Sequence, residues 1–488
     1  MTKAKRRFAK HSRDVALAAL AGGCIVRIGF HAARGRVAAT RQVRGGEVLG
    51  PSARVLILSA ADAVTGPLAE GLDRLGWRTV TARTLDAACV ALGDFPIEAA
   101  IVDCVAGKAD VEAVAQLRAA VKPLRLPIIA LAQAGGRGDF SGFDLVLPSQ
   151  PHPAQAALRL EQAVRAAVAE EEFALRRDTF GEKGVHLDLP SEPSRPARVL
   201  VVGEPAPAFL ALSNALQETE GTDVVAAFTA YTAFDYLHER PFDAVVLWGG
   251  DDQAAALSIA GGMRRNTRLY HVPTLLYLRH NADLNLSEAY NRGVTDVAAP
   301  DVPETESAAR IMALARAYRR QTAVRDALDK VRGSGLMDAA TGLFTRDLFA
   351  THLARLGRSA QALRRPLSVC VLKVSERPEV TKAREGGWLD KAMPQIGSMI
   401  ARLVRAEDTA ARLGPEVFAL ALPATGPSQA RLVGERIAAV LGCTAFENGD
   451  GEPPFVIEFD VGVAKLEPGQ SAADALEVAA RFEQLQAG

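Results

Sequence analysis

Residues 405–422 read RAEDTAARLGPEVFALAL. Two short runs rich in apolar residues, 408–413 and 418–422, flank a Gly-Pro-Glu turn and predict a β-hairpin. An apolar helix over 394–403 precedes the hairpin and is expected to end at Arg405, while Asp408 opens the next strand. The side chains of Arg405 and Asp408 are therefore expected to lie at one corner. A guanidinium can bind guanine O6 and N7 or a phosphate, and a carboxylate can accept from the N1/N2 edge of guanine.

Upstream of this stretch, short buried strands alternate with amphipathic helices, and the pattern occurs twice. This alternation predicts two parallel sheets covered by helices on both faces, produced by a tandem duplication. The predicted strands are 54–58, 77–82, 99–102, 127–131 and 143–147 in the first copy, and 198–202, 242–247, 273–277 and 294–298 in the second. Residues 304–331 form a predicted helix with near-heptad spacing, which suits packing either against a partner helix or on its own domain.

The 488-residue chain is long enough for several domains, and its five cysteines have no CxxC spacing. A reducing cytosol without a zinc site is therefore expected. Residues 1–50 hold 11 Lys and Arg against two acids, so the rest of the chain is acidic, which argues against nucleic-acid binding. An apolar run at 15–26 mimics a signal peptide but is too short to span a bilayer. We interpret this segment as a disordered tail or an upstream extension from a misassigned start, and expect no membrane insertion.

The duplicated module resembles the response-regulator receiver domain, which implies a flavodoxin-like fold with a doubly wound parallel sheet. That family holds Mg²⁺ with an acidic pair after the first strand and phosphorylates an aspartate after the third. In the first copy Asp103 matches the phosphoacceptor, but Ser59 and Ala60 replace the acidic pair. We therefore interpret Asp103 as vestigial, because Mg²⁺ requires oxygen ligands that carboxylates supply. In the second copy Trp248 occupies the acceptor position, so this copy is predicted to be a packing module.

From residue 336 to the end, the chain resembles GGDEF domains, which are α+β, nucleotidyl-cyclase-like domains of diguanylate cyclases. Residues 338–346, DAATGLFTR, match the entry motif of that family. In the family, an Arg-x-x-Asp motif before the hairpin binds cyclic di-GMP at an inhibitory site. The resemblance therefore implies a cyclic di-GMP site at Arg405 and Asp408, with Arg436 as the secondary arginine and Arg412 also in register.

The residues needed for synthesis are altered. Lys373 replaces the metal-binding aspartate of the family, and Ser375 and Thr381 replace two further functional residues. In the signature turn, Pro415 replaces a glycine that lets the nucleotide approach, and Val417 replaces an acid. The family positions at Asp390 and Glu416 are retained. We therefore predict that the chain binds cyclic di-GMP without metal and is not an enzyme.

These inferences divide the chain into six parts. They are a basic extension (1–51), a degenerate receiver domain (52–172), a linker (173–196), a second degenerate receiver domain (197–320), a stem helix and linker (321–336) and a degenerate GGDEF domain (337–488).

The receiver-receiver-GGDEF arrangement is that of PleD-type cyclases, and the altered synthesis site resembles PopA-like cyclic di-GMP effectors. That resemblance implies a cytoplasmic, homodimeric adaptor in two-component and cell-cycle signalling. Such an adaptor moves to a cell pole and, with RcdA, delivers CtrA to the ClpXP protease. Two alternatives remain open from the sequence. One is an active diguanylate cyclase, and the other is a scaffold driven by phosphorylation of Asp103.

Overall fold

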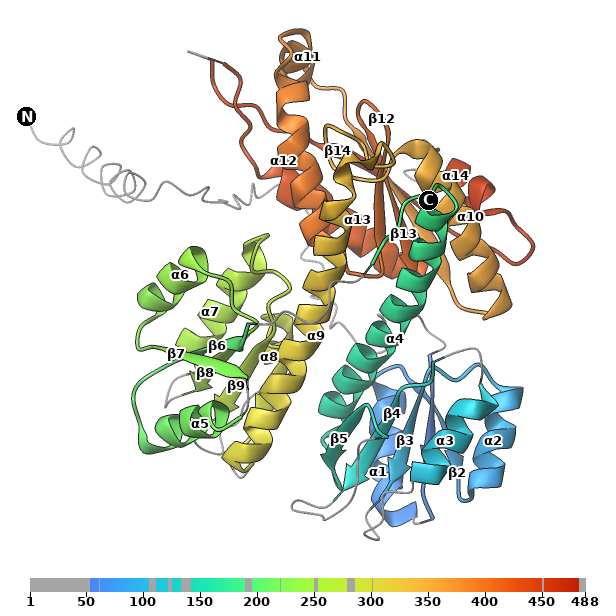
Figure 1. The fold of residues 1–488 in the computed structure, drawn as a ribbon, viewed down its shortest axis with the longest axis vertical. Coiled ribbons are helices and arrows are strands. Elements are labelled where there is room, and N and C mark those ends of the chain that lie inside the picture. The colour runs from blue at the N-terminus through green and yellow to red at the C-terminus, as the bar shows by residue number, and fades with distance from the viewer. Residues whose placement is uncertain are drawn as a thin grey trace, which may run out of the picture.

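The computed structural model describes residues 53–481 except 61, 105–110, 122–124, 133–141, 189–194, 220, 250–252, 279–285, 301 and 450–451. The predicted basic extension, residues 1–51, lies outside the described residues. Figure 1 shows two α/β modules below a C-terminal domain, with the long helices α4 and α9 reaching from the modules to that domain.

The first module contains a five-stranded parallel sheet in the order β2-β1-β3-β4-β5, which is the flavodoxin-like order. Its strands are β1 (Arg54–Leu58), β2 (Arg78–Ala82), β3 (Ala99–Asp103), β4 (Ile128–Ala132) and β5 (Leu145–Pro148). Its helices are α1 (Asp62–Arg74), α2 (Leu85–Asp94), α3 (Val111–Ala120) and α4 (Pro153–Gly181). Every β4 residue is buried, as expected for a strand covered on both faces.

The second module repeats this topology, with strands in the order β7-β6-β8-β9-β10. The strands are β6 (Ala197–Val202), β7 (Thr222–Ala227), β8 (Ala244–Gly249), β9 (Thr274–Leu278) and β10 (Asp296–Ala298). The helices are α5 (Pro207–Gln217), α6 (Ala230–Glu239), α7 (Ala254–Arg265), α8 (Leu286–Asn291) and α9 (Glu304–Lys330). The predicted parallel α/β sheets are therefore confirmed, and the two modules share one strand order.

The C-terminal domain is built on an antiparallel sheet in the order β12-β13-β11-β14. The strands are β11 (Leu367–Val374), β12 (Thr409–Gly414), β13 (Val417–Pro423) and β14 (Phe459–Lys465). The helices are α10 (Arg346–Ala362), α11 (Pro378–Glu385), α12 (Trp388–Leu403), α13 (Pro427–Gly442) and α14 (Ala472–Ala479), with a 3₁₀ turn, η2 (Arg332–Ser334), before the domain. The predicted hairpin is present as β12 and β13.

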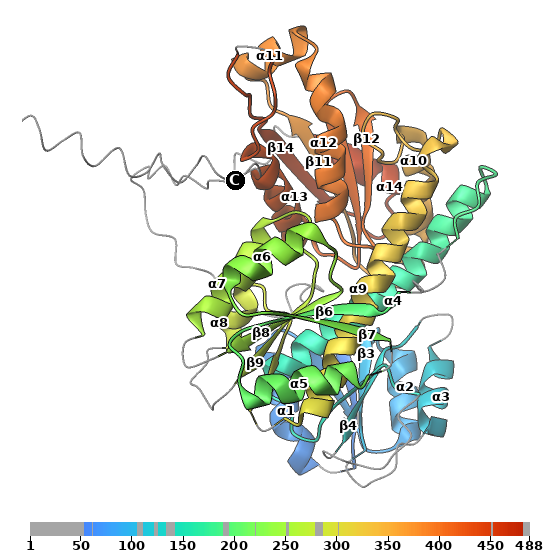
Figure 2. The same cartoon turned by 60° about the vertical axis from the view of Figure 1, so that its left-hand side comes forward.

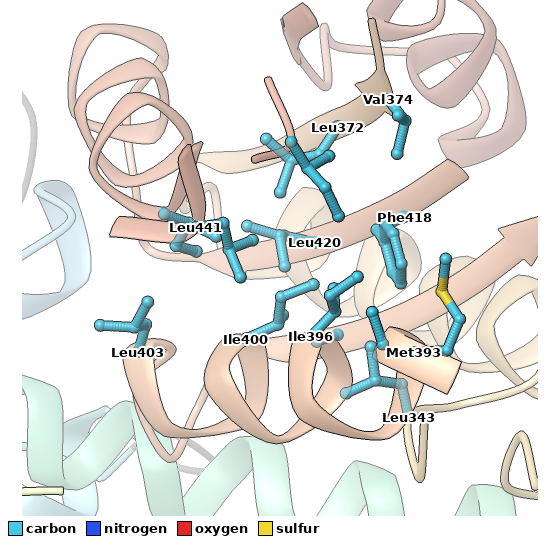
Figure 3. Packing of buried hydrophobic residues seen from close by; sticks show 14 of the residues in the cluster. Leu343, Leu372, Val374, Met393, Ile396, Ile400, Leu403, Phe418, Leu420 and Leu441 are labelled. Carbon is cyan, nitrogen blue, oxygen red and sulfur yellow. The ribbon is translucent and has the colours of Figure 1, made fainter. Parts of the chain in front are cut away.

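One face of α12 fixes the position of the loop that follows it. Met393, Ile396 and Ile400 project from this helix toward Leu420 and Phe418 of β13, as Figure 3 shows. Leu403, the last residue of the helix, is also buried in this core. Because the end of α12 is held by the core, the loop 404–408 has a fixed place beside the hairpin.

The predicted linker, residues 173–196, begins inside a helix, because α4 continues to Gly181. The chain stays helical because Phe173 and Phe180 pack into the C-terminal domain, in one cluster with Phe344 and Phe349. From the sequence alone, the polar composition of residues 176–196 and their three prolines favour a linker.

Helix α9 likewise crosses the predicted boundary at residue 320 and is helical to Lys330. Its first half packs in the second module through Ile311 and Ala315, and its second half packs on the C-terminal domain through Val324 and Ala327. Helices α4 and α9 lie side by side in both views and are joined by an ion pair between Arg320 and Glu170 at 3.0 Å (Figures 1 and 2).

Candidate functional site

The segment between α12 and β12 forms a tight corner that positions Arg405 and Asp408. The backbone N–H of Arg405 donates to Asp408 Oδ2 at 2.9 Å, and the N–H of Asp408 donates to the Arg405 carbonyl at 3.3 Å. Asp408 is 5% exposed, and its Oδ1 atom is buried with no hydrogen-bond donor among the described residues. A buried carboxylate oxygen without a donor is costly, so this corner has unused capacity to accept a hydrogen bond.

Arg436 reaches this corner from α13. Its Nη2 donates to the carbonyl of Leu403 at 3.0 Å, and its Nη1 donates to the Tyr270 hydroxyl at 2.6 Å. The guanidinium also lies 4.8 Å from the centre of the Tyr270 ring, which is cation–π range. The structure thus brings together the three residues predicted from the sequence, Arg405, Asp408 and Arg436.

The electrostatics of the corner combine several arginines with fewer acids. Burial alone would lower the pKa of Arg405, but the carboxylates of Glu407, Asp408 and Glu161 raise it, so the guanidinium stays protonated. Burial and the neighbouring Asp408 raise the pKa of Glu407. Buried charged groups in such a site are stabilised by an additional partner that supplies both opposite charge and hydrogen bonds.

The second module contributes Tyr270 and His271, which the sequence analysis did not identify. They lie in the loop between α7 and β9, and their rings are in edge contact at 4.9 Å. Burial and the guanidiniums of Arg325 and Arg436 lower the pKa of His271 well below its ordinary value. Its Nε2 atom is buried without a partner among the described residues. A loop with one tyrosine and one histidine gives no sequence signal for a site on another domain.

Helix α4 of the first module covers the other side of the corner. Arg176 donates to the carbonyls of Ala406 and Asp408, both at 3.3 Å, and to Thr409 Oγ1 at 3.1 Å. Arg165 Nη1 lies 3.5 Å from Glu407 Oε1 and donates to the carbonyl of Pro423 at 3.3 Å. The corner is therefore enclosed by elements of all three parts of the chain.

A buried polar network anchors α4 to the C-terminal domain. Glu172 accepts from Arg176 and contacts His352 Nε2 at 2.9 Å, while His352 Nδ1 contacts Thr179 at 3.0 Å. Burial would raise the pKa of Glu172, but Arg176 and His352 lower it below its ordinary value. Burial lowers the pKa of His352. Because the carboxylate of Glu172 is paired with Arg176, this buried network can fix the orientation of α4 in the interface.

The turn between β12 and β13 has a different set of contacts. Glu416 is held by Arg384 of α11, whose Nη2 donates to Oε2 at 2.7 Å, and this pairing raises the pKa of Arg384. Lys373 lies on β11 opposite Val417 and Asp460. Pro415 accepts from Arg412 through its carbonyl at 2.8 Å. Glu416 is thus already paired with a guanidinium, and an ammonium group lies on the neighbouring strand, an environment that does not favour binding of Mg²⁺.

Thr381 and Asp390, which the GGDEF resemblance places at guanine-contacting positions of the family, lie apart from the corner. Thr381 is on α11 and Asp390 is an exposed residue in the first turn of α12. Within the described ranges, no group of three His, Cys, Asp or Glu side chains is arranged to hold a metal ion.

In the first module, Asp103 lies at the end of β3, where the receiver resemblance places a phosphoacceptor. Ser59 Oγ donates to Asp103 Oδ2 at 2.7 Å. In the second module, Trp248 is 6% exposed and stacks on Tyr277, with ring centres 5.1 Å apart. An indole packed in this way fills the acceptor position with a hydrophobic contact.

We expect Asp103 to remain unmodified when the full chain is incubated with acetyl phosphate and Mg²⁺. The reason is that Ser59 supplies a hydroxyl where the metal needs a carboxylate. Intact-protein mass spectrometry would check this, with an Asp103→Asn variant as the baseline. A phosphoryl adduct on the wild-type chain that is missing from the variant would contradict the prediction.

Comparisons with known proteins agree with the C-terminal fold. Residues 335–484 match the family model described as Diguanylate cyclase, GGDEF domain. Response regulator PleD from two strains of Caulobacter vibrioides is 22% identical over 224 residues, which cover 46% of this chain and 49% of PleD. The chain therefore spans about half the length of the curated relatives that it matches.

Solved structures that are similar to part of the chain include two GGDEF domains. One is the FimX GGDEF domain from Pseudomonas aeruginosa, with 23% identity, a TM-score of 0.28, and coverage of 30% of this chain and 90% of that one. The other is the GGDEF domain of DgcB from Caulobacter crescentus in complex with c-di-GMP, with 23% identity, a TM-score of 0.28, and coverage of 30% and 84%. Among the described helices, none has both the length and the apolar composition to cross a bilayer.

Proposed function

We propose that this chain is a receptor for cyclic di-GMP that binds the dinucleotide at Arg405, Asp408 and Arg436, does not synthesise it, and acts as an adaptor. The observation that supports this most directly is the arrangement of the corner. The guanidiniums of Arg405 and Arg436 interact electrostatically with Asp408, whose buried Oδ1 atom accepts no hydrogen bond from the described residues.

The chemistry of the corner fits a guanine nucleotide with phosphodiester groups. Asp408 can accept from the N1/N2 edge of a guanine, and Arg405 can donate to O6 and N7 or to a phosphate. Arg436, held against the ring of Tyr270, adds a second cation that can donate to a phosphate or to a guanine edge. A molecule with two guanines and two phosphates uses all of these groups at once.

The hairpin supports the non-catalytic part of the proposal. Glu416, at the retained acidic position, is neutralised by Arg384, and Lys373 repels a cation at the neighbouring position. Two magnesium ions would have to displace an ion pair and lie next to an ammonium group. Synthesis of the dinucleotide from two GTP molecules is therefore not expected.

The two N-terminal modules are proposed to be degenerate receiver domains that supply dimerisation and partner surfaces. Ligand binding would favour one arrangement of these modules over another by its differential affinity for the two. By the resemblance to PopA-like effectors, the partners would be RcdA, CtrA and the ClpXP machinery, at a pole of the cell. A cytoplasmic homodimer is the form in which this adaptor would act.

We expect purified full-length chain to bind cyclic di-GMP in calorimetry with one saturable transition, and to release no pyrophosphate from GTP with Mg²⁺. The corner supplies the binding groups, whereas the hairpin lacks the metal ligands. GTP is the matched control ligand in the same titration. Pyrophosphate release above a no-protein blank would show an active cyclase and would contradict the proposal.

A further inference from the structure

Helix α4 of the first module lies over the corner that the proposed ligand must reach. Arg165 and Arg176 are 11 positions apart on this helix, a separation of about 16 Å at 1.5 Å per residue. Arg165 contacts Glu407 on one side of the loop, and Arg176 donates to Ala406 and Asp408 on the other. Both acidic residues of the corner are at most 5% exposed in this arrangement.

The contacts of α4 surround the groups that the proposed ligand would use: Arg165 contacts Glu407, and Arg176 donates to the backbone of Ala406 and Asp408. Glu161, one turn before Arg165, places a carboxylate near Arg405, as a phosphate of the ligand would. The charged form of Arg165 is destabilised at this contact, because burial and the like charge of Arg405 lower the pKa of Arg165 to about 10. Glu161 therefore attracts Arg405, whereas Arg165 repels it, so the contact between α4 and the corner contains both stabilising and destabilising interactions.

We propose that α4 competes within the chain for the cyclic di-GMP site, so that ligand binding and docking of α4 on the corner exclude one another. Binding of the dinucleotide then loosens the first module from the C-terminal domain. This inference rests on the proposed function and names its regulation. It makes the first module the element whose position reports whether the ligand is bound.

The free energy needed to detach α4 from the C-terminal domain determines how strongly docking of α4 competes with ligand binding. Glu172, Arg176 and His352 form a buried network in this interface, and Phe173 and Phe180 pack beside it. A ligand that binds only the open form has its apparent affinity reduced by the fraction of open molecules. Any change that weakens docking without touching the corner is therefore expected to tighten ligand binding.

Arg365 allows this test, because it joins the first module to the C-terminal domain outside the corner. Its Nε donates to Glu98 of the first module at 3.0 Å, and its Nη1 pairs with Glu171 of α4. We expect Arg365→Ala to tighten cyclic di-GMP binding about fivefold or more in calorimetry, within the usual range of coupling between sites. Loss of a positive charge would by itself weaken binding of an anion, so the expected direction is diagnostic.

Arg364→Ala is the matched control, since this neighbouring arginine is exposed and lies outside the Glu98 and Glu171 contacts. Its affinity should stay within about twofold of wild type, as for a surface substitution. Glu161→Gln removes a carboxylate beside Arg405 as well as part of the contact of α4, so it should also tighten binding. Hydrogen exchange keeps the test usable if Arg365→Ala does not fold.

Hydrogen exchange of the full chain supplies a second readout. With saturating cyclic di-GMP, we expect deuterium uptake to rise in peptides that cover Glu172, Phe180 and His352. If ligand binds but Arg365→Ala and Glu161→Gln match wild type and uptake in these peptides does not rise, the inference is wrong while the proposed function stands. If wild type, Arg365→Ala and Glu161→Gln all fail to bind cyclic di-GMP, both the inference and the proposed function are wrong.

Discussion

Arg405→Ala is expected to weaken binding of cyclic di-GMP by a factor of about 100 or more, because charge-assisted hydrogen bonds contribute about 1.5–3 kcal/mol each and a guanidinium can make two. Arg405 is the guanidinium that Glu407, Asp408 and Glu161 keep protonated at the corner. Calorimetric titration of the variant beside wild type measures the loss.

Arg431→Ala is a suitable control, since Arg431 lies on α13 with Arg436 but is partly exposed, at 39%, and pairs with Glu435 at 3.9 Å. It should bind like wild type, whereas Arg436→Ala should lose affinity. Circular dichroism and thermal melting would show whether Arg405→Ala keeps its fold. Equal affinities for wild type and a folded Arg405→Ala would refute the site.

Asp296→Ala is expected to destabilise the second module by about 3–5 kcal/mol, the cost of breaking a buried ion pair from one side. Asp296 is fully buried and accepts from Arg310 at 2.7 and 3.0 Å, and it also pairs with Arg159 of α4. Without it, two buried guanidiniums face each other without a carboxylate. Urea unfolding followed by tryptophan fluorescence, to which Trp248 contributes from the second module, would report this loss.

The ion pair between Asp223 and Arg198 in the same module gives a comparison for this experiment. Both side chains are partly exposed, at 41% and 28%, and their contact is 2.7 Å long. Asp223→Ala should therefore cost less than about 1 kcal/mol, as is usual for surface pairs. Similar losses for Asp223→Ala and Asp296→Ala would contradict the importance of burial at Asp296.

The strands of both modules could be predicted because parallel strands covered on both faces are continuous apolar runs. The strand 54–58 predicted from the sequence is β1 itself, and the hairpin of β12 and β13 follows the apolar runs around Gly414 and Pro415. The closeness of Arg405, Asp408 and Arg436 could also be anticipated, because their positions relative to the hairpin match a known motif. In each case the signal is local or carried by a pattern of fixed spacing.

The surroundings of the corner could not be predicted from the sequence. Glu172 and Arg176 resemble any solvated i,i+4 pair, and only tertiary contacts with His352 show that they are buried. Tyr270 belongs to a short loop 166 positions before Arg436, and no periodicity connects the two. The continuation of α4 into the predicted linker could not be predicted either, because its last turns are stabilised by contacts with another domain.

A crystal structure of the full chain grown with cyclic di-GMP tests the central claim most directly. We expect a guanine edge against the Oδ1 atom of Asp408, with the guanidiniums of Arg405 and Arg436 on the same ligand. An empty corner at saturating ligand, or the dinucleotide bound instead against the hairpin at Glu416, would contradict the account.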